Sequence, residues 1–293
     1  MSDLELANCF IRSNLAPGVN YGGSLYFTSF NGGYEPTVGF LLRITNSEFE
    51  GNNGYEGGGM YCDEARGEIA NTKIFDCQSA LNGAGVYLAR MGTDNQLDFT
   101  NCVFLDNFCA SGGTATQGGG MYLGPAAGVG SGGRAKMVNC TFAGNACSGN
   151  PPIDGQALGV SATSQAFVYN SILFWNGSDG AGNPAPIAGA ATVDYSDIEG
   201  GWPTGNNIGA DPLFVDLQHG NLVLQSPASP CLDAADYGRL PHGTLLDVDG
   251  DGDLLEIIPW DIAKQWRWID VPGLQDSGAG LYTFLDMGAY EHP

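Results

Sequence analysis

One phrase of the sequence is written twice, and this repetition restricts the fold more than any other feature. The stretch NCVFLDNFCASGG at 101–113 returns as NCTFAGNACSGN at 139–150, with Asn, Cys, Phe, Asn and Cys at the same offsets. Related phrases begin at six asparagines: Asn8, Asn46, Asn71, Asn101, Asn139 and Asn170. Repeats of about 20–50 residues are typical of solenoids, in which each coil packs only on its neighbours.

A second phrase alternates with the first. YGGSLY, GGGMY, GAGVY and GGGMY end at Tyr26, Tyr61, Tyr87 and Tyr122. Each unit therefore contains a Gly-rich turn with a short strand, a variable insert, another strand, and an Asn corner that leads to a third strand. No window maintains the apolar spacing of a helix. Glycine accounts for 46 of 293 residues, which fits many tight turns between short strands.

Side-chain parity indicates what the repeat builds. In FLLRITNSEF, Phe40, Leu42 and Ile44 alternate toward one face before Asn46, and LDFTNCVF at 97–104 repeats the pattern. After each Asn the parity slips by one, so that the residue at +1 and the Phe at +3 point inward. A strand that turns a corner and keeps its apolar face inside coils around a core. The sequence therefore predicts an all-β parallel solenoid.

Two further positions in each coil are read as scaffold. Position +1 holds small residues, namely Cys9, Ser47, Thr72, Cys102, Cys140 and Ser171. Position +6 holds Asn14, Asn52, Asn107, Asn145 and Asn176, whose amides are expected to bond along the axis. In the Asn71 coil we expect an extra residue to shift the register and remove this Asn. The eight cysteines leave two alternatives open, buried free thiols or one or two disulfides.

Charge excludes several partners. The chain has 32 acidic and 10 basic residues, a formal net charge of −22, and no clustered basic surface for nucleic acid. No apolar run reaches the length of a transmembrane segment. MSDLELANCF shows neither the basic nor the apolar region of an export signal, and it begins almost inside a repeat, so we expect the natural protein to extend upstream. We expect a monomer.

The C-terminal third carries a resemblance. DYSDIEGGW, GNNIGADPLFVD, GNLVLQSPASPCLDAAD, DVDGDGD and LDMGAYE together resemble the end of bacterial right-handed parallel β-helix repeat proteins, including choice-of-anchor Q domain proteins. The NCTF and GGGMY units resemble the repeats of polymorphic outer-membrane proteins. The resemblance implies a pectate-lyase-like fold: a right-handed parallel β-helix of about six to eight coils with an irregular C-terminal capping region. It also implies an extracellular or cell-surface location.

We expect one domain with two regions. Residues 1–200 would form the repeats, and residues 201–293 the last coils and a C-terminal cap with an acidic loop, packed on the helix. That loop is DVDGDGD, in which Asp247, Asp249, Asp251 and Asp253 alternate and Gly252 allows a sharp turn. Converging carboxylates would bind Ca²⁺. The alternative is a solvated acidic turn.

Three tryptophans close to one another form the other candidate site. Trp260, Trp266 and Trp268 lie in IIPWDIAKQWRW with Lys264 and Arg267. Exposed, they would stack on sugars and bind a ligand. Buried, they would close the open end of the solenoid, where apolar residues and strand edges would otherwise be exposed.

No catalytic constellation stands out. The coils offer possible bases (Arg66, Lys73, Arg90, Arg134, Lys136) and acids (Asp63, Glu64, Asp76, Asp94, Asp98, Asp106), without a repeated cluster. We therefore favour a non-catalytic surface module that binds an extracellular polysaccharide or a surface protein, or acts as a spacer. The alternative is a polysaccharide lyase or glycoside hydrolase. Catalytic residues stay unassigned.

Overall fold

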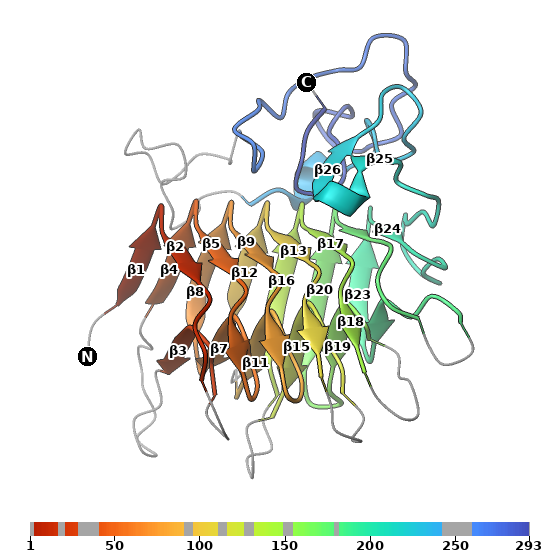
Figure 1. Cartoon of the computed structure of the whole chain (residues 1–293). Helices are drawn as coiled ribbons and strands as arrows, with labels where there is room; N and C mark the ends of the chain where they lie inside the picture. Colours follow the sequence, from red (N-terminus) through yellow and green to blue (C-terminus); the bar gives the residue numbers. More distant parts are fainter. Residues whose placement is uncertain are drawn as a thin grey trace.

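The computed structural model describes residues 3–16, 21–28, 41–90, 96–110, 116–125, 132–148, 155–178, 182–241 and 260–292. Over these ranges the chain forms a parallel β-helix, as predicted, with the strands of successive coils side by side (Figure 1). Each complete coil contributes a strand to four sheets, which we name A, B, C and D. Sheets A and B have seven strands each, so the described part of the solenoid has seven coils, within the predicted range.

Sheets A and B meet at the asparagine corner. In spatial order, sheet A contains β1 (Leu4–Ala7), β4 (Leu41–Thr45), β8 (Arg66–Ala70), β12 (Leu97–Thr100), β16 (Arg134–Val138), β20 (Gln165–Tyr169) and β23 (Ala191–Asp194). Sheet B contains β2 (Phe10–Arg12), β5 (Glu48–Glu50), β9 (Lys73–Phe75), β13 (Val103–Leu105), β17 (Thr141–Ala143), β21 (Ile172–Leu173) and β24 (Asp197–Ile198).

Sheets C and D complete the coil. Sheet C contains β6 (Asn53–Gly54), β10 (Gln78–Ser79), β14 (Phe108–Cys109) and β18 (Ala146–Cys147). Sheet D contains β3 (Leu25–Thr28), β7 (Met60–Asp63), β11 (Val86–Ala89), β15 (Met121–Gly124), β19 (Leu158–Val160) and β22 (Ile187–Ala188). All pairs within the four sheets are parallel, and equivalent residues of the repeat lie in register, for example Tyr61 beside Tyr87.

The asparagine corner, defined as Asn8, Asn46, Asn71, Asn101, Asn139 and Asn170, changes the side-chain parity. All six residues are left-handed, with φ between 48° and 55°. Asn adopts this conformation more easily than other non-glycine residues, which explains its recurrence at this turn. The amides also bond along the axis: Asn101 Nδ2 donates to Asn71 Oδ1 at 3.1 Å.

The asparagines at position +6 form hydrogen bonds along the axis, as predicted, but one expectation about them is corrected. Asn107 Nδ2 donates to Asn145 Oδ1 at 2.9 Å, and Asn145 donates to Asn176 at 3.0 Å. The expected register shift in the Asn71 coil is wrong, because β9 pairs with β13 without an insertion. Cys77 occupies the position of the missing Asn and receives the contact from Asn52 Nδ2 at 4.0 Å.

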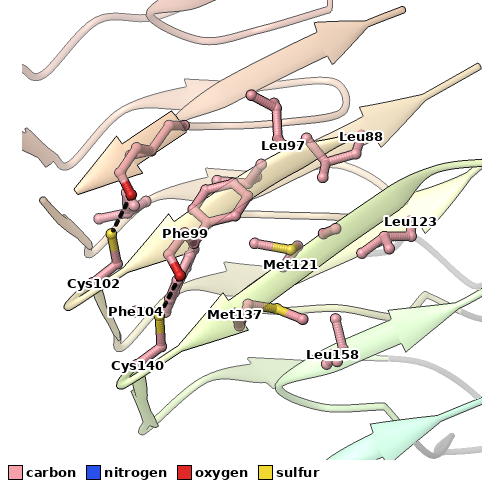
Figure 2. Close-up of a cluster of buried hydrophobic side chains, with 14 of the residues drawn as sticks. Leu88, Leu97, Phe99, Cys102, Phe104, Met121, Leu123, Met137, Cys140 and Leu158 are labelled. Carbon is pink, nitrogen blue, oxygen red and sulfur yellow. Dashed lines mark hydrogen bonds between the residues drawn. The ribbon is translucent and has the colours of Figure 1, made fainter. Parts of the chain in front are cut away.

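Large side chains from sheets A, B and D fill the core. Phe104, labelled in Figure 2, is fully buried and stacks on the equally buried Phe142, with ring centroids 4.2 Å apart. The thiols of Cys102 and Cys140 point inward and contact backbone oxygens of the preceding coil, those of Ile69 at 3.4 Å and Phe99 at 3.5 Å. All eight cysteines are free thiols. The paired phrases therefore build the scaffold.

The residues after β24 form an irregular tail with little regular structure. It contains the antiparallel hairpin of β25 (Phe214–Asp216) and β26 (Asn221–Leu224) and the short 3-10 helices η1 (Leu217–His219) and η2 (Tyr237–Arg239). The tail lies along one side of the coils (Figure 1). Its Leu285 and Ala289 pack in one cluster with Val103, Ala143 and Ile172 on sheet B.

Trp202 lies just after the last coil and packs against the core cluster of the solenoid. Among the described residues no helix has the length and apolar character needed to cross a membrane.

Candidate functional site

The tail holds the solenoid through the asparagine corner. Asn101 Nδ2 donates to the backbone oxygen of Trp260 at 2.7 Å, and Asn101 Oδ1 accepts from Arg267 Nη2 at 2.9 Å. One coil further on, the Ala289 N–H donates to Thr141 Oγ1 at 2.9 Å. The Asn101 side-chain amide thus forms a hydrogen bond with the backbone of the tail.

Asn170 repeats the arrangement in the next coil. Its Nδ2 donates to the Asp236 carbonyl and its Oδ1 accepts the Asp236 N–H, both at 2.9 Å. The Asn170 carbonyl accepts the Gly288 N–H at 2.8 Å. A side-chain amide that both donates to and accepts from one residue fixes that segment in position and direction.

Arg267 is the buried centre of the tail. It is fully buried, and besides Asn101 it contacts Glu291 Oε2 at 3.2 Å and the Gly288 carbonyl at 3.1 Å. Burial raises the pKa of Asp286 to about 7, and it raises the pKa of Glu291 as well, while Arg267 opposes both increases. The tail therefore encloses a small polar network rather than a purely apolar interface.

Toward the first coils, the asparagine corner and the tail together line a cavity. This cavity, which we call the groove, has a volume of about 310 Å³ and lies between the first coils and the turn at 260–266. Asn8, Asn46 and Asn71 contribute the amides. The groove is thus an open stretch of the same corner that the tail covers at Asn101.

Two lysines and one exposed aromatic ring complete the groove. Lys73 reaches it from β9, Lys264 from the tail, and Phe10, which is 70% exposed, from β2. Lys73 Nζ lies 6.0 Å from the centre of the Tyr290 ring. Neither lysine has an ion-pair partner among the residues that the structure describes, whereas Glu48 at the same groove is paired with Arg12.

The three predicted tryptophans come together on the tail. Trp260 and Trp266 pack edge to face with centroids 5.1 Å apart, and Trp266 packs against Trp268 at 6.3 Å. Trp268 also contacts Tyr282 at 5.1 Å. We call these residues, with Tyr237, the aromatic patch; Trp266 is 43% exposed and Tyr282 38%.

The aromatic patch differs from an end cap. Trp260 is tied to Asn101 near the middle of the corner, so the patch lies along the side of the coils and not over their open end. Its turn at 260–266 also supplies Ile262 and Lys264 to the groove. One short segment therefore carries both candidate ligand-binding features.

Four of the acids and bases considered in the coils form two ion pairs. Arg90 pairs with the buried Asp63, and Lys136 Nζ lies 3.1 Å from Asp98 Oδ2. Asp94 lies outside the described residues. Of the five candidate bases, Lys73 is a lining residue of the groove.

The predicted calcium loop is not described, but another acidic cluster is. Asp247, Asp249, Asp251 and Asp253 fall within 242–259, outside the described residues. Asp233, Asp270 and Asp276 each offer a carboxylate oxygen within 4.8 Å of the others and could hold a metal ion. Burial raises the pKa of Asp233 to about 6, with the backbone N–H of Val271 opposing and the neighbouring carboxylates adding to the rise.

Sequence reasoning missed this acidic triad and the groove. Asp233 and Asp276 are far apart in the chain and belong to no regular motif, so only the folded tail brings them together. The sequence contains one indication of the groove: three of its lining residues, Asn8, Asn46 and Asn71, are the first residues of repeats.

Comparison with known proteins identified no relative: no family model, no curated protein and no solved structure matches the chain. The site is therefore interpreted from its own geometry.

Proposed function

We propose that the protein is a non-catalytic module that binds an acidic extracellular polysaccharide along the groove. The observation that carries the proposal is the convergence of Lys73 and Lys264 on one polar cavity without a carboxylate partner among the described residues. The chain has only 10 basic residues and a net charge of −22, so two lysines at one cavity are a local exception to its negative charge. Ammonium groups would contact sugar carboxylates, and the corner amides would bond to hydroxyls.

The negative net charge is compatible with this ligand. At physiological salt the Debye length is about 8 Å, so distant surface carboxylates are largely screened while the groove lysines act at contact. Phe10 and the aromatic patch offer faces on which sugar rings can stack. These features favour a glycan over a protein partner or a pure spacer role.

The proposal also includes where the protein is located and to which superfamily it is related. A polysaccharide ligand fits an exported or cell-surface protein, and the parallel β-helix is the fold that the resemblance to the pectate-lyase-like superfamily implies. The solenoid supports this kinship only at the level of the fold.

The test is binding to polygalacturonate, alginate and neutral dextran in 0.15 M salt, by calorimetry. We expect binding to an acidic polymer and weaker binding by about two- to five-fold for Lys73→Ala and Lys264→Ala, the size of an exposed charge contact. Lys136→Ala is the matched control, because Lys136 is paired with Asp98 on sheet A. Trp266→Ala tests the aromatic patch.

Two outcomes would contradict the proposal. Binding by none of the polymers would leave the groove without this function. Shortening of a polymer, followed by gel filtration, would instead support the lyase or hydrolase alternative, with Lys73 as the first residue to test as the base.

A further inference from the structure

The acidic triad of the tail has a feature that exposed acidic clusters lack. The Asp233 side chain is completely buried, and neither of its carboxylate oxygens makes a hydrogen bond of good geometry with another described residue, although the Val271 N–H is near enough to lower its pKa. A buried carboxylate without a well-formed hydrogen bond is costly, because it has lost its hydration. Asp233 faces Asp270 and Asp276, two further carboxylates that repel it.

Hydrogen bonds fix the backbone of Asp233, and this holds its side chain beside Asp270 and Asp276. Its N–H donates to Asp286 Oδ1 at 2.8 Å, and its carbonyl accepts the N–H groups of Ser277 and Gly278 at 2.8 and 2.9 Å. The residue is left-handed, with φ of 48°. Asp276 is oriented as well, because its Oδ2 accepts from Thr283 Oγ1 at 2.6 Å.

The oxygen positions fit one cation. Two oxygens bound at about 2.4 Å to the same Ca²⁺ are at most about 4.8 Å apart, and the three triad oxygens meet this limit. Carboxylates are hard ligands, which suits Ca²⁺ better than zinc, and Asp270 and Asp276 are exposed, so water can complete a shell of six to eight oxygens.

We propose that Asp233, Asp270 and Asp276 bind a calcium ion that joins the segment at 231–235 to the segment at 270–277. The first segment lies on the solenoid through Cys231, whose thiol donates to Asp197 Oδ2 in β24 at 3.1 Å. The ion would therefore fix the outer part of the tail to the part that contacts the last coil. This site shares no residue with the loop at 247–253 or with the groove.

The test uses the full chain, freed of metal with a chelator and titrated with CaCl₂ by calorimetry. Asp270→Asn and Asp276→Asn are the main variants, because both residues are exposed and Asn keeps the size of the side chain. Each is expected to weaken calcium binding at least tenfold and to reduce the calcium-dependent increase in melting temperature. Asp216→Asn, an exposed tail carboxylate bonded to His219, is the control and should bind within twofold of the parent.

A variant with Asp247, Asp249, Asp251 and Asp253 all replaced by Asn separates the two acidic sites. Retained calcium binding in this variant, with loss in Asp270→Asn, is the expected result. The proposal is wrong if the chain binds no calcium, if the loop variant alone abolishes binding, or if Mg²⁺ binds the triad as tightly as Ca²⁺.

Discussion

Arg267 donates to Asn101 Oδ1 at 2.9 Å, although 166 residues separate the two in the chain. The guanidinium is fully buried and shares its remaining contacts with Glu291 and the Gly288 carbonyl. This contact joins the tail to the asparagine corner, and the stability of the tail should depend on it.

Replacing Arg267 with Met should therefore destabilise the protein by about 3–5 kcal/mol, because it leaves Glu291 buried without its cation. Urea denaturation followed by tryptophan fluorescence would measure the loss. Arg239→Met is the control: the Arg239 side chain is 38% exposed and bonds to Asp194, so a loss below about 1 kcal/mol is expected. Equal losses in both variants would show that Arg267 has no special role.

The stacked core phenylalanines give a second prediction. Phe142→Ala removes a fully buried ring that stacks on Phe104, and the resulting cavity should cost about 3–5 kcal/mol. Phe108, which is 40% exposed on sheet C, is the matched control, and its replacement by Ala should cost less than about 1 kcal/mol. Comparable urea midpoints for the two variants would contradict the packing described for the core.

Cys77 offers a prediction in the opposite direction, toward higher stability. Where other coils have Asn, Cys77 places its thiol 3.7 Å from the Phe49 carbonyl and 4.0 Å from Asn52 Nδ2. An Asn at this position could donate to Phe49 and accept from Asn52, as Asn145 does between Phe104 and Asn107. Cys77→Asn should thus increase the free energy of unfolding by about 1 kcal/mol.

Cys77→Ser is the control for this change, since a hydroxyl is too short to complete the ladder. It should be no more stable than the parent. A Cys77→Asn protein that unfolds at lower urea than the parent would show that the coil has adapted to the thiol.

Asp197 predicts a pH dependence of stability. Burial raises its pKa from 3.8 to about 7, with the Cys231 thiol opposing the rise. Between about pH 4 and 7 the folded state holds a proton that the unfolded state has released, so this group makes stability fall as pH rises, by up to about 1.4 kcal/mol per unit. Its contribution is fully present below about pH 4 and lost above about pH 7.

Asp197→Asn removes this titration while keeping the shape of the side chain. The difference in unfolding free energy between parent and variant should therefore change with pH, in favour of the variant from pH 5 to pH 7.5. A difference that stays constant across this range would mean that Asp197 is not protonated in the folded protein.

The solenoid could be predicted from sequence because its causes are local. Strand parity has a period of two, and Asn favours the left-handed corner, so LDFTNCVF alone indicates a coil with Phe99 and Phe104 inside. The register shift expected in the Asn71 coil is wrong because Ile74 takes the inward position after the corner and is buried, whereas the aromatic Phe75 next to it is only partly buried.

The tail could not be predicted in the same way, because its position depends on contacts between distant residues. Nothing near Arg267 in the sequence indicates Asn101, and Asp233 gives no sign of meeting Asp270 and Asp276. The three tryptophans were identified as a group, but their placement along the side followed only from the bond between Trp260 and Asn101.

A solenoid whose coils contact only their neighbours can fray from either end, one coil at a time. The tail opposes this, because it bonds to three successive coils: to Asn101 through Trp260, to Thr141 through Ala289 and to Asn170 through Gly288. In the described part of the chain these three bonded positions lie in the later coils, whereas at the first coils the tail lines the groove through Ile262 and Lys264. Amide exchange should therefore be polarised, with one cooperative half that opens as a block and one that loosens gradually toward the N-terminus.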